Sequence, residues 1–236
     1  MSSAGKQSSQ QLPLQIKLRD EATRDNFFAT PLTEPLLEQL ESQLAPQGEP
    51  IILLYGPGAC GKSHLLQASC HLAGSAALYL PLRNISDYSP EEVLSGVESL
   101  NLVCLDDLDA VLGVPEWELA LFNLFNRARA AQCRLLVAAS AAPRALSLDL
   151  EDLRSRLSWG IVYQLQESSD DDKTAILQFR ASRRGLHLTD EVARYIVNRA
   201  PRSLDHLLAL LDDLDQASLV EKRALSIPFV KQALGW

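Results

Sequence analysis

Residues 51–63 read Ile-Ile-Leu-Leu-Tyr-Gly-Pro-Gly-Ala-Cys-Gly-Lys-Ser, an apolar strand that runs into a glycine-rich turn. The spacing of Gly56, Gly61, Lys62 and Ser63 is that of a P-loop. Glycines let the chain bend where a Cβ would clash, so backbone N–H groups can face phosphate oxygens. The helix predicted to follow points its positive end at the same anion. The stretch therefore predicts a nucleotide-phosphate site in an α/β fold.

The positions of this loop have distinct predicted tasks. Lys62 places a point charge near the β- and γ-phosphates, and the hydroxyl of Ser63 can ligate Mg²⁺. Cys60 is interpreted as a tolerated small residue rather than a redox group. The predicted nucleotide-binding residues of this stretch are Gly56, Pro57, Gly58, Ala59, Cys60, Gly61, Lys62, Ser63 and His64.

Composition limits the classes of function that need to be considered. The chain has 236 residues, of which 47% are hydrophobic, and a net charge of −8. This charge argues against a protein that binds nucleic acid through overall electrostatics. The four cysteines are scattered without metal-ligand spacing, which predicts buried thiols in a reducing compartment. No apolar run is long enough to span a membrane and no signal peptide is evident, so we expect a soluble cytoplasmic protein.

Periodicity predicts two structural parts after a polar tail. Apolar runs of strand length alternate with helical patterns, which indicates a five-stranded parallel sheet covered on both faces in three layers. The chain beyond residue 166 reads as helices only. The predicted domains are a disordered tail with a short apolar patch (1–17), an α/β core (18–166) and an all-α domain (167–236). The predicted strands are 51–55, 76–80, 102–105, 135–139 and 161–165, and the predicted helices are 33–44, 62–73, 90–97, 117–131, 150–157, 170–184, 189–199, 203–216 and 228–234.

Polar side chains follow two of the predicted strands. Asp106 and Asp107 end the strand at 102–105, where an acid beside a P-loop holds Mg²⁺ and a second acid can orient a water. Asp106 is the predicted metal residue and Asp107 the candidate base. Ser140 ends the next strand and could sense a γ-phosphate, or it could be a simple turn residue. Glutamate is commoner than aspartate as the base of vigorous ATPases, so efficient self-hydrolysis is not expected.

Three arginines complete the set of candidates. Arg154 and Arg156 lie about 200° apart around a helix, so they cannot easily serve one ligand. One could brace the fold while the other points outward, toward the nucleotide of a neighbouring subunit. Arg202 begins the leucine-striped helix of the all-α domain and could fold back over bound phosphates. Solvated surface arginines are the alternative in each case.

The order of these parts resembles the AAA+ family of P-loop ATPases, and within it the replication initiator DnaA and its shorter Hda relatives. Three stretches carry the likeness to the Hda group. They are Leu-Val-Cys-Leu-Asp-Asp-Leu-Asp (102–109), Asp-Leu-Arg-Ser-Arg-Leu-Ser-Trp-Gly (152–160) and Ile-Pro-Phe-Val-Lys (227–231). The likeness covers nearly the whole chain. It departs at Ala139-Ser140-Ala141, where the family can carry an acidic Gly-Asp-Arg-like sequence.

The resemblance implies a negative regulator of replication initiation. A family member with ADP (or ATP) and Mg²⁺ bound docks on the DNA polymerase III sliding clamp and stimulates hydrolysis of ATP held by DnaA. Arg156 would be the arginine finger acting in trans and Arg202 the sensor of the lid. Arg154 would support the finger or face the partner. The clamp peptide resembles Gln-Leu-x-Leu and would comprise Gln11, Leu12, Leu14 and Ile16.

Two other functions remain open at this point. A self-sufficient AAA+ ATPase, such as a helicase or clamp loader, would need Asp107 to be an effective base. A pure clamp adaptor would leave Arg156 idle. The chain stops at the lid, before the helix-turn-helix with which DnaA reads DNA, so sequence-specific DNA binding is not expected. The sequence leaves open the resident nucleotide, self-association and which surface of DnaA is contacted.

Overall fold

The computed structural model describes residues 18–236. The predicted clamp peptide, with Gln11, Leu12, Leu14 and Ile16, lies outside the described residues and stays a prediction.

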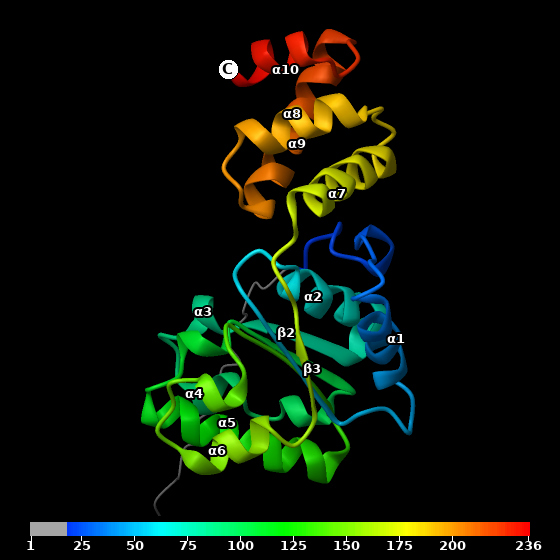
Figure 1. The fold of residues 1–236 in the computed structure, drawn as a ribbon. Coiled ribbons are helices and arrows are strands. Elements are labelled where there is room, and N and C mark those ends of the chain that lie inside the picture. Colours follow the sequence, from blue (N-terminus) through cyan, green and yellow to red (C-terminus); the bar gives the residue numbers. More distant parts are fainter. Residues whose placement is uncertain (1–17) are drawn as a thin grey trace, which may run out of the picture.

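A five-stranded parallel sheet forms the centre of the larger part of the molecule (Figure 1). The strand order is β2-β3-β4-β1-β5, so β1 lies between β4 and β5. This order places the turn after β1 beside the ends of two strands that come much later in the sequence. The strands are β1 (Ile51–Tyr55), β2 (Ala77–Pro81), β3 (Leu102–Asp106), β4 (Arg134–Ala139) and β5 (Ile161–Gln164).

Successive residues of the central strands enter two different cores, because side chains alternate across a sheet. Ile52 and Leu54 pack under the helices α1 (Glu34–Gln43) and α2 (Lys62–Ala73). Leu53 and Val103 face the opposite side, which is covered by four further helices. These are α3 (Leu82–Ile85), α4 (Pro90–Val93), α5 (Pro115–Ala131) and α6 (Glu151–Leu157). The predicted three-layer α/β architecture is confirmed.

The C-terminal part consists of helices only and lies above the α2 side of the core (Figure 1). Its apolar centre includes Leu207, Leu211 and Leu214, three members of the predicted leucine stripe. The first helix begins at a capping box in which Ser169 and Asp172 exchange hydrogen bonds. The helices are α7 (Asp170–Arg183), α8 (Asp190–Arg199), α9 (Leu204–Glu221) and α10 (Ile227–Leu234). The predicted all-α lid is thus present. The predicted domain limit at 166/167 falls between β5 and α7 and stays a proposal.

Two helix predictions differ from the structure by more than two residues at one end. The helix expected over 90–97 ends at Val93, because Gly96 adopts a left-handed conformation with φ 74° and turns the chain. The helix expected to end at residue 216 continues to Glu221, because nothing in Ala217-Ser218-Leu219 breaks a helix. Within residues 18–236, no helix is long and apolar enough to cross a membrane.

Candidate functional site

The P-loop joins β1 to α2 through two glycines that no other residue could replace without strain. Gly56 has φ 154°, and a Cβ on it would lie 2.1 Å from the carbonyl oxygen of Leu165. Gly61 has φ 95° and immediately precedes Lys62, the first residue of α2. The P-loop therefore packs closely against the end of β5. The N-terminus of α2 follows directly and faces the space that the loop encloses, and this is the geometry that binds phosphate.

Two cationic or polar side chains of the loop have well-defined partners. The Nζ of Lys62 donates to the carbonyl oxygens of Gly56 (2.7 Å) and Pro57 (2.6 Å), so its charge sits inside the curl. The Nε2 of His64 lies 2.8 Å from the carbonyl oxygen of Thr23, and burial lowers the pKa of this imidazole. His64 is therefore neutral near pH 7 and anchors the N-terminal segment to the loop.

A cavity of about 570 Å³ opens in front of the P-loop. Four segments that are distant in sequence enclose it: the loop itself, residues 26–36, the stretch after β5, and the lid helices α7 and α9. Its size lies in the range of roughly 300–1,000 Å³ that is typical of small-ligand sites. The cavity, the glycine curl and the cation of Lys62 together suit the phosphates of a nucleotide.

The two predicted acids have different environments. Asp106 is 2% exposed, and its carboxylate accepts hydrogen bonds from the Tyr79 hydroxyl (2.6 Å) and the Asp107 N–H (2.9 Å). Burial and this carboxylate raise the pKa of Tyr79 far above its ordinary value, so the phenol keeps its proton. Asp107 lines the cavity, but its carboxylate pairs with Arg83 at 3.2 Å. The candidate base is thus held by a guanidinium.

The lining of the cavity does not include Ser140. Its N–H and its hydroxyl both bond to the carboxylate of Asp109, at 2.7 Å and 2.6 Å. These contacts tie the end of β4 to the segment after β3 and leave the Ser140 hydroxyl engaged with Asp109. The structure therefore supplies no contact that favours the predicted sensing role over the turn role.

Arg202 does lie near the P-loop. It lines a smaller cavity of about 470 Å³ together with Gly58 and Ala59, the tip of that loop. Lys173 of α7 lines the same space, is 3% exposed, and pairs with Glu167 at 3.5 Å. Arg202 and Lys173 of the lid therefore lie beside the tip of the P-loop, and the ammonium of Lys173 is paired with Glu167 and Asp170.

The segment after Leu18 connects the core to the lid. On the core side, the Arg19 N–H donates to Gln67 of α2 at 2.8 Å. On the lid side, the carboxylate of Glu21 pairs with Arg180 of α7 and with Arg184, which follows that helix. Burial opposes ionisation of Glu21, but the two guanidinium groups outweigh it and lower its pKa. This segment therefore forms a wall of the cavity and constrains the lid above it.

The two arginines of α6 are used in opposite ways. Arg154 donates to the carbonyl oxygens of Pro143 (2.8 Å), Leu146 (2.9 Å) and Leu148 (3.0 Å), and to Glu151. Its guanidinium holds the loop between β4 and α6 in place. These contacts favour the bracing role that the sequence left open for one of the pair.

Arg156 keeps its outer nitrogens available. Its Nε donates to Asn126 Oδ1 at 2.9 Å, and its guanidinium lies 3.8 Å from the ring centre of Trp159 and 5.2 Å from that of Phe122. Within residues 18–236, no group accepts a hydrogen bond from its two terminal nitrogens. The α6 helix lies on the opposite face of the sheet from α2, and Arg156 does not line the cavity of its own P-loop.

Several supporting residues were not found from the sequence. The carboxylate of Glu118, 1% exposed, accepts from the N–H groups of Gly113, Asp149 and Leu150, which fixes the start of α6. Asn126 holds Arg156 from a neighbouring helix. A helical pattern does not show these contacts, because Asp149 and Leu150 are more than 30 residues from Glu118 and Asn126 is 30 residues from Arg156. The one available signal was Glu118, a glutamate at a position on the buried face of the predicted helix.

Comparison with known proteins identifies the group to which these parts belong. Residues 170–234 match the family model described as the Hda lid domain. An uncharacterized protein of Haemophilus influenzae is 42% identical over 230 residues, which is 96% of this chain and 99% of that protein. Domain III of Thermotoga maritima DnaA superposes with a TM-score of 0.77 at 19% identity, covering 93% of this chain and 98% of that one. AMPPCP-bound DnaA of Aquifex aeolicus superposes with a TM-score of 0.69 at 22% sequence identity, covering 87% of this chain and 69% of that one. The lid of this chain therefore matches the Hda lid domain, and the chain as a whole shares the fold of domain III of DnaA.

Proposed function

We propose that the protein is a negative regulator of replication initiation that stimulates hydrolysis of ATP bound to DnaA, with Arg156 entering the partner's nucleotide site. The observation that carries this proposal is the contrast on α6. The N–H groups of Arg154 donate to carbonyl oxygens of the loop between β4 and α6. The terminal nitrogens of Arg156 have no acceptor in residues 18–236. A planar guanidinium with two outward N–H groups suits the equatorial oxygens of a transferring phosphoryl group.

The protein's own cavity would hold a nucleoside diphosphate such as ADP. The glycine curl and Lys62 fit the two phosphates, and Arg202 would close over them from the lid. Mg²⁺ would reside mainly on the phosphates, with Ser63 in the cavity wall and Asp106 behind it. In residues 18–236 no cluster of three protein ligands could hold a metal alone. AMPPCP in the solved Aquifex DnaA supports nucleotide binding in this fold.

Bound nucleotide would order the lid rather than fuel turnover. Asp107, the candidate base, has its carboxylate 3.2 Å from the guanidinium of Arg83, so orienting a water would compete with this exposed ion pair. The lid meets the core through Glu21, Arg180 and the P-loop cavity, which a nucleotide would fill. This arrangement disfavours the self-sufficient ATPase.

Recruitment would depend on the DNA polymerase III sliding clamp. The peptide at residues 11–16 would insert its leucines into a groove of the clamp, as extended peptides with alternate apolar anchors do. It begins only a few residues before the segment that contacts α2 and α7. The clamp would thereby bring the protein and DnaA together on DNA.

The test is single-turnover hydrolysis of ATP pre-bound to DnaA, with the protein, ADP and DNA-loaded clamp added. Arg156→Ala should remove the stimulation, since an arginine finger contributes roughly 10³–10⁵-fold in rate. Arg144→Ala is the matched control, because Arg144 is exposed on the neighbouring turn. Normal stimulation by Arg156→Ala would refute the finger assignment.

A second variant separates recruitment from chemistry. Deletion of residues 1–16 should abolish clamp binding while the thermal midpoint stays unchanged, because the proposed role of the peptide is recruitment and the chain from Leu18 onward is retained. Clamp binding that survives this deletion would refute the peptide assignment. Clamp binding by the full chain without any stimulation would favour the adaptor alternative.

A further inference from the structure

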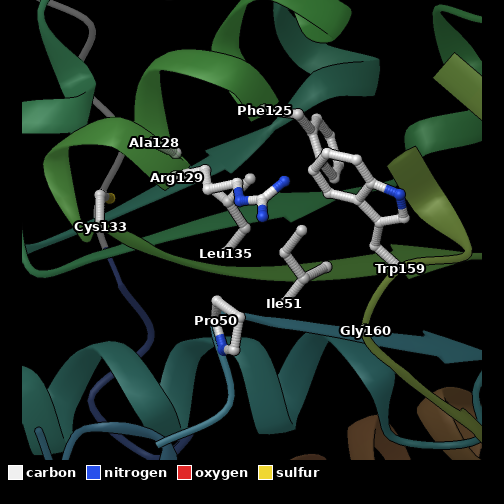
Figure 2. A pocket seen from close by; sticks show the side chains of 9 residues that line it. All are labelled: Pro50, Ile51, Phe125, Ala128, Arg129, Cys133, Leu135, Trp159 and Gly160. Carbon is white, nitrogen blue, oxygen red and sulfur yellow. The ribbon is translucent and has the colours of Figure 1, made fainter. Parts of the chain in front are cut away.

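A second cavity, of about 410 Å³, lies at the end of the sheet where the strands begin, away from the P-loop, and Figure 2 shows the residues that line it. It is formed where β1, β4 and β5 begin, under the C-terminal turns of α5. The P-loop follows the carboxyl end of β1, whereas Ile51 at this cavity is its first residue. The two cavities therefore share no lining residue and can be occupied independently.

The interior of this cavity is apolar and uncharged. Phe125, Ile51 and Ala128 form much of its wall, and all three are buried in the core. Cys133 contributes a thiol, but burial and the nearby Glu98 raise its pKa to about 11, so it carries no charge at neutral pH. An occupant would therefore gain by placing an apolar group here.

One cation stands at the rim. Arg129 is exposed, and its guanidinium extends across the cavity in Figure 2, 4.6 Å from the ring centre of Trp159. No acceptor for a hydrogen bond from this guanidinium, and no ion-pair partner, occurs in residues 18–236. None of the lining residues is acidic. The N–H groups of Arg129 are thus free to bind an anion, and the net charge of the residues that line the cavity is positive.

The aromatic wall is held rigidly in position. A Cβ on Gly160 would lie 1.9 Å from the carbonyl oxygen of Ile51, so the backbone after Trp159 rests directly on β1. Trp159 is still 42% exposed, which leaves ring surface uncovered. The same indole supports the guanidinium of Arg156 at 3.8 Å. A ligand in this cavity would therefore touch a residue that also supports Arg156.

We propose that this cavity binds a small aromatic anion, with its ring beside the exposed indole of Trp159 and its carboxylate or sulfonate on Arg129. The volume lies within the range of roughly 300–1,000 Å³ found for small-ligand sites. The combination of an apolar interior, an exposed indole and one unpaired cation selects for a ligand that has both parts. A neutral aromatic compound would bind less tightly, and a bare anion would gain little.

The test compares two fluorescent probes that differ in charge, anilinonaphthalene sulfonate and uncharged N-phenylnaphthylamine. Both are titrated with saturating ADP present, so that the P-loop cavity is blocked. We expect one saturable sulfonate site per chain. Arg129→Gln should weaken sulfonate binding about five- to twentyfold and change binding of the neutral probe less than about twofold, because only the charged contact is removed. Arg144→Gln, at another exposed arginine, should change neither.

A second pair of variants tests the apolar interior. Ala128→Leu places extra methyl groups in the cavity and should weaken both probes at least about tenfold, whereas Ala130→Leu adds the same groups on the solvent side of α5. Thermal melts show whether the Ala128→Leu variant folds. If that variant does not fold, probe binding by Arg129→Gln alone tests the proposal. Equal sulfonate affinity in Arg129→Gln and Arg144→Gln would overturn the proposal, as would an absence of saturable binding. Neither arm depends on the clamp or on DnaA.

Discussion

The contrast between Arg154 and Arg156 gives a quantitative prediction about stability. Arg154→Met removes hydrogen bonds to three main-chain carbonyl oxygens, those of Pro143, Leu146 and Leu148. Leaving a buried acceptor unpaired costs about 1–3 kcal/mol, and we take about 1 kcal/mol for each because the site is partly accessible to water. The predicted loss is about 3 kcal/mol. For a chain of this size it corresponds to a fall of about 6–12 °C in the thermal midpoint.

Arg156→Met should cost much less. It removes one hydrogen bond, to Asn126, and the stacking of a partly exposed guanidinium on Trp159, while the thioether of Met keeps part of the aromatic contact. The predicted loss is about 1 kcal/mol.

Urea unfolding of both variants, followed by circular dichroism, measures the difference, and the DnaA assay described above measures stimulation. Arg154→Met should be the less stable protein and Arg156→Met the one that fails to stimulate. Equal destabilisation by the two changes would refute the division of roles between bracing and reaching outward.

Three further predictions concern the supports of the site. Gly56→Ala should abolish the ADP-dependent rise in thermal midpoint, because its Cβ would meet the Leu165 carbonyl at 2.1 Å; calorimetric ADP binding of normal affinity would contradict the proposed curl. Glu118→Ala should lower stability by about 3 kcal/mol, since three N–H groups lose their acceptor, and an unfolding free energy within about 1 kcal/mol of the wild type would be inconsistent with that role. Burial depresses the pKa of His64, so the unfolded chain binds more protons and stability falls as the pH drops below the unfolded pKa of about 6.5. His64→Gln keeps a donor for Thr23 and should flatten this fall between about pH 7.5 and about pH 5.5 in urea titrations; an unchanged slope would exclude His64 as its source.

Much of the fold could be predicted because its signals are local. The P-loop spacing, the five apolar runs and the leucine stripe each depend on residues within one element, and the observed strands agree with the predicted ones to within one residue at each end. The Gly96 turn was missed because a single glycine in a helical pattern is a weak signal. The match to the Hda lid and the likeness to DnaA agree with the resemblance inferred from the motifs.

Side-chain roles were harder to predict, because they depend on partners brought together by the strand order. For Ser140 the sequence leaves a sensor and a turn residue open, and the carboxylate that holds its hydroxyl, Asp109, follows the neighbouring strand β3. Asp107 stays a candidate base, and its partner Arg83, on a short helix after β2, reaches it because β2 and β3 are adjacent in the sheet.

Glycine spacing and hydrophobic period act over a few positions, so the fold class and the candidate residues could be predicted before folding was considered. Arg154 and Arg156 are two residues apart and alike in chemistry, so their difference in contacts emerges only in the folded chain. The loop from Pro143 to Leu148 turns its carbonyl oxygens toward one guanidinium, while Asn126 and Trp159 support the other from the side. The cavity beside Trp159 likewise arises from the beginnings of three strands and the end of α5, which only the folded chain brings together.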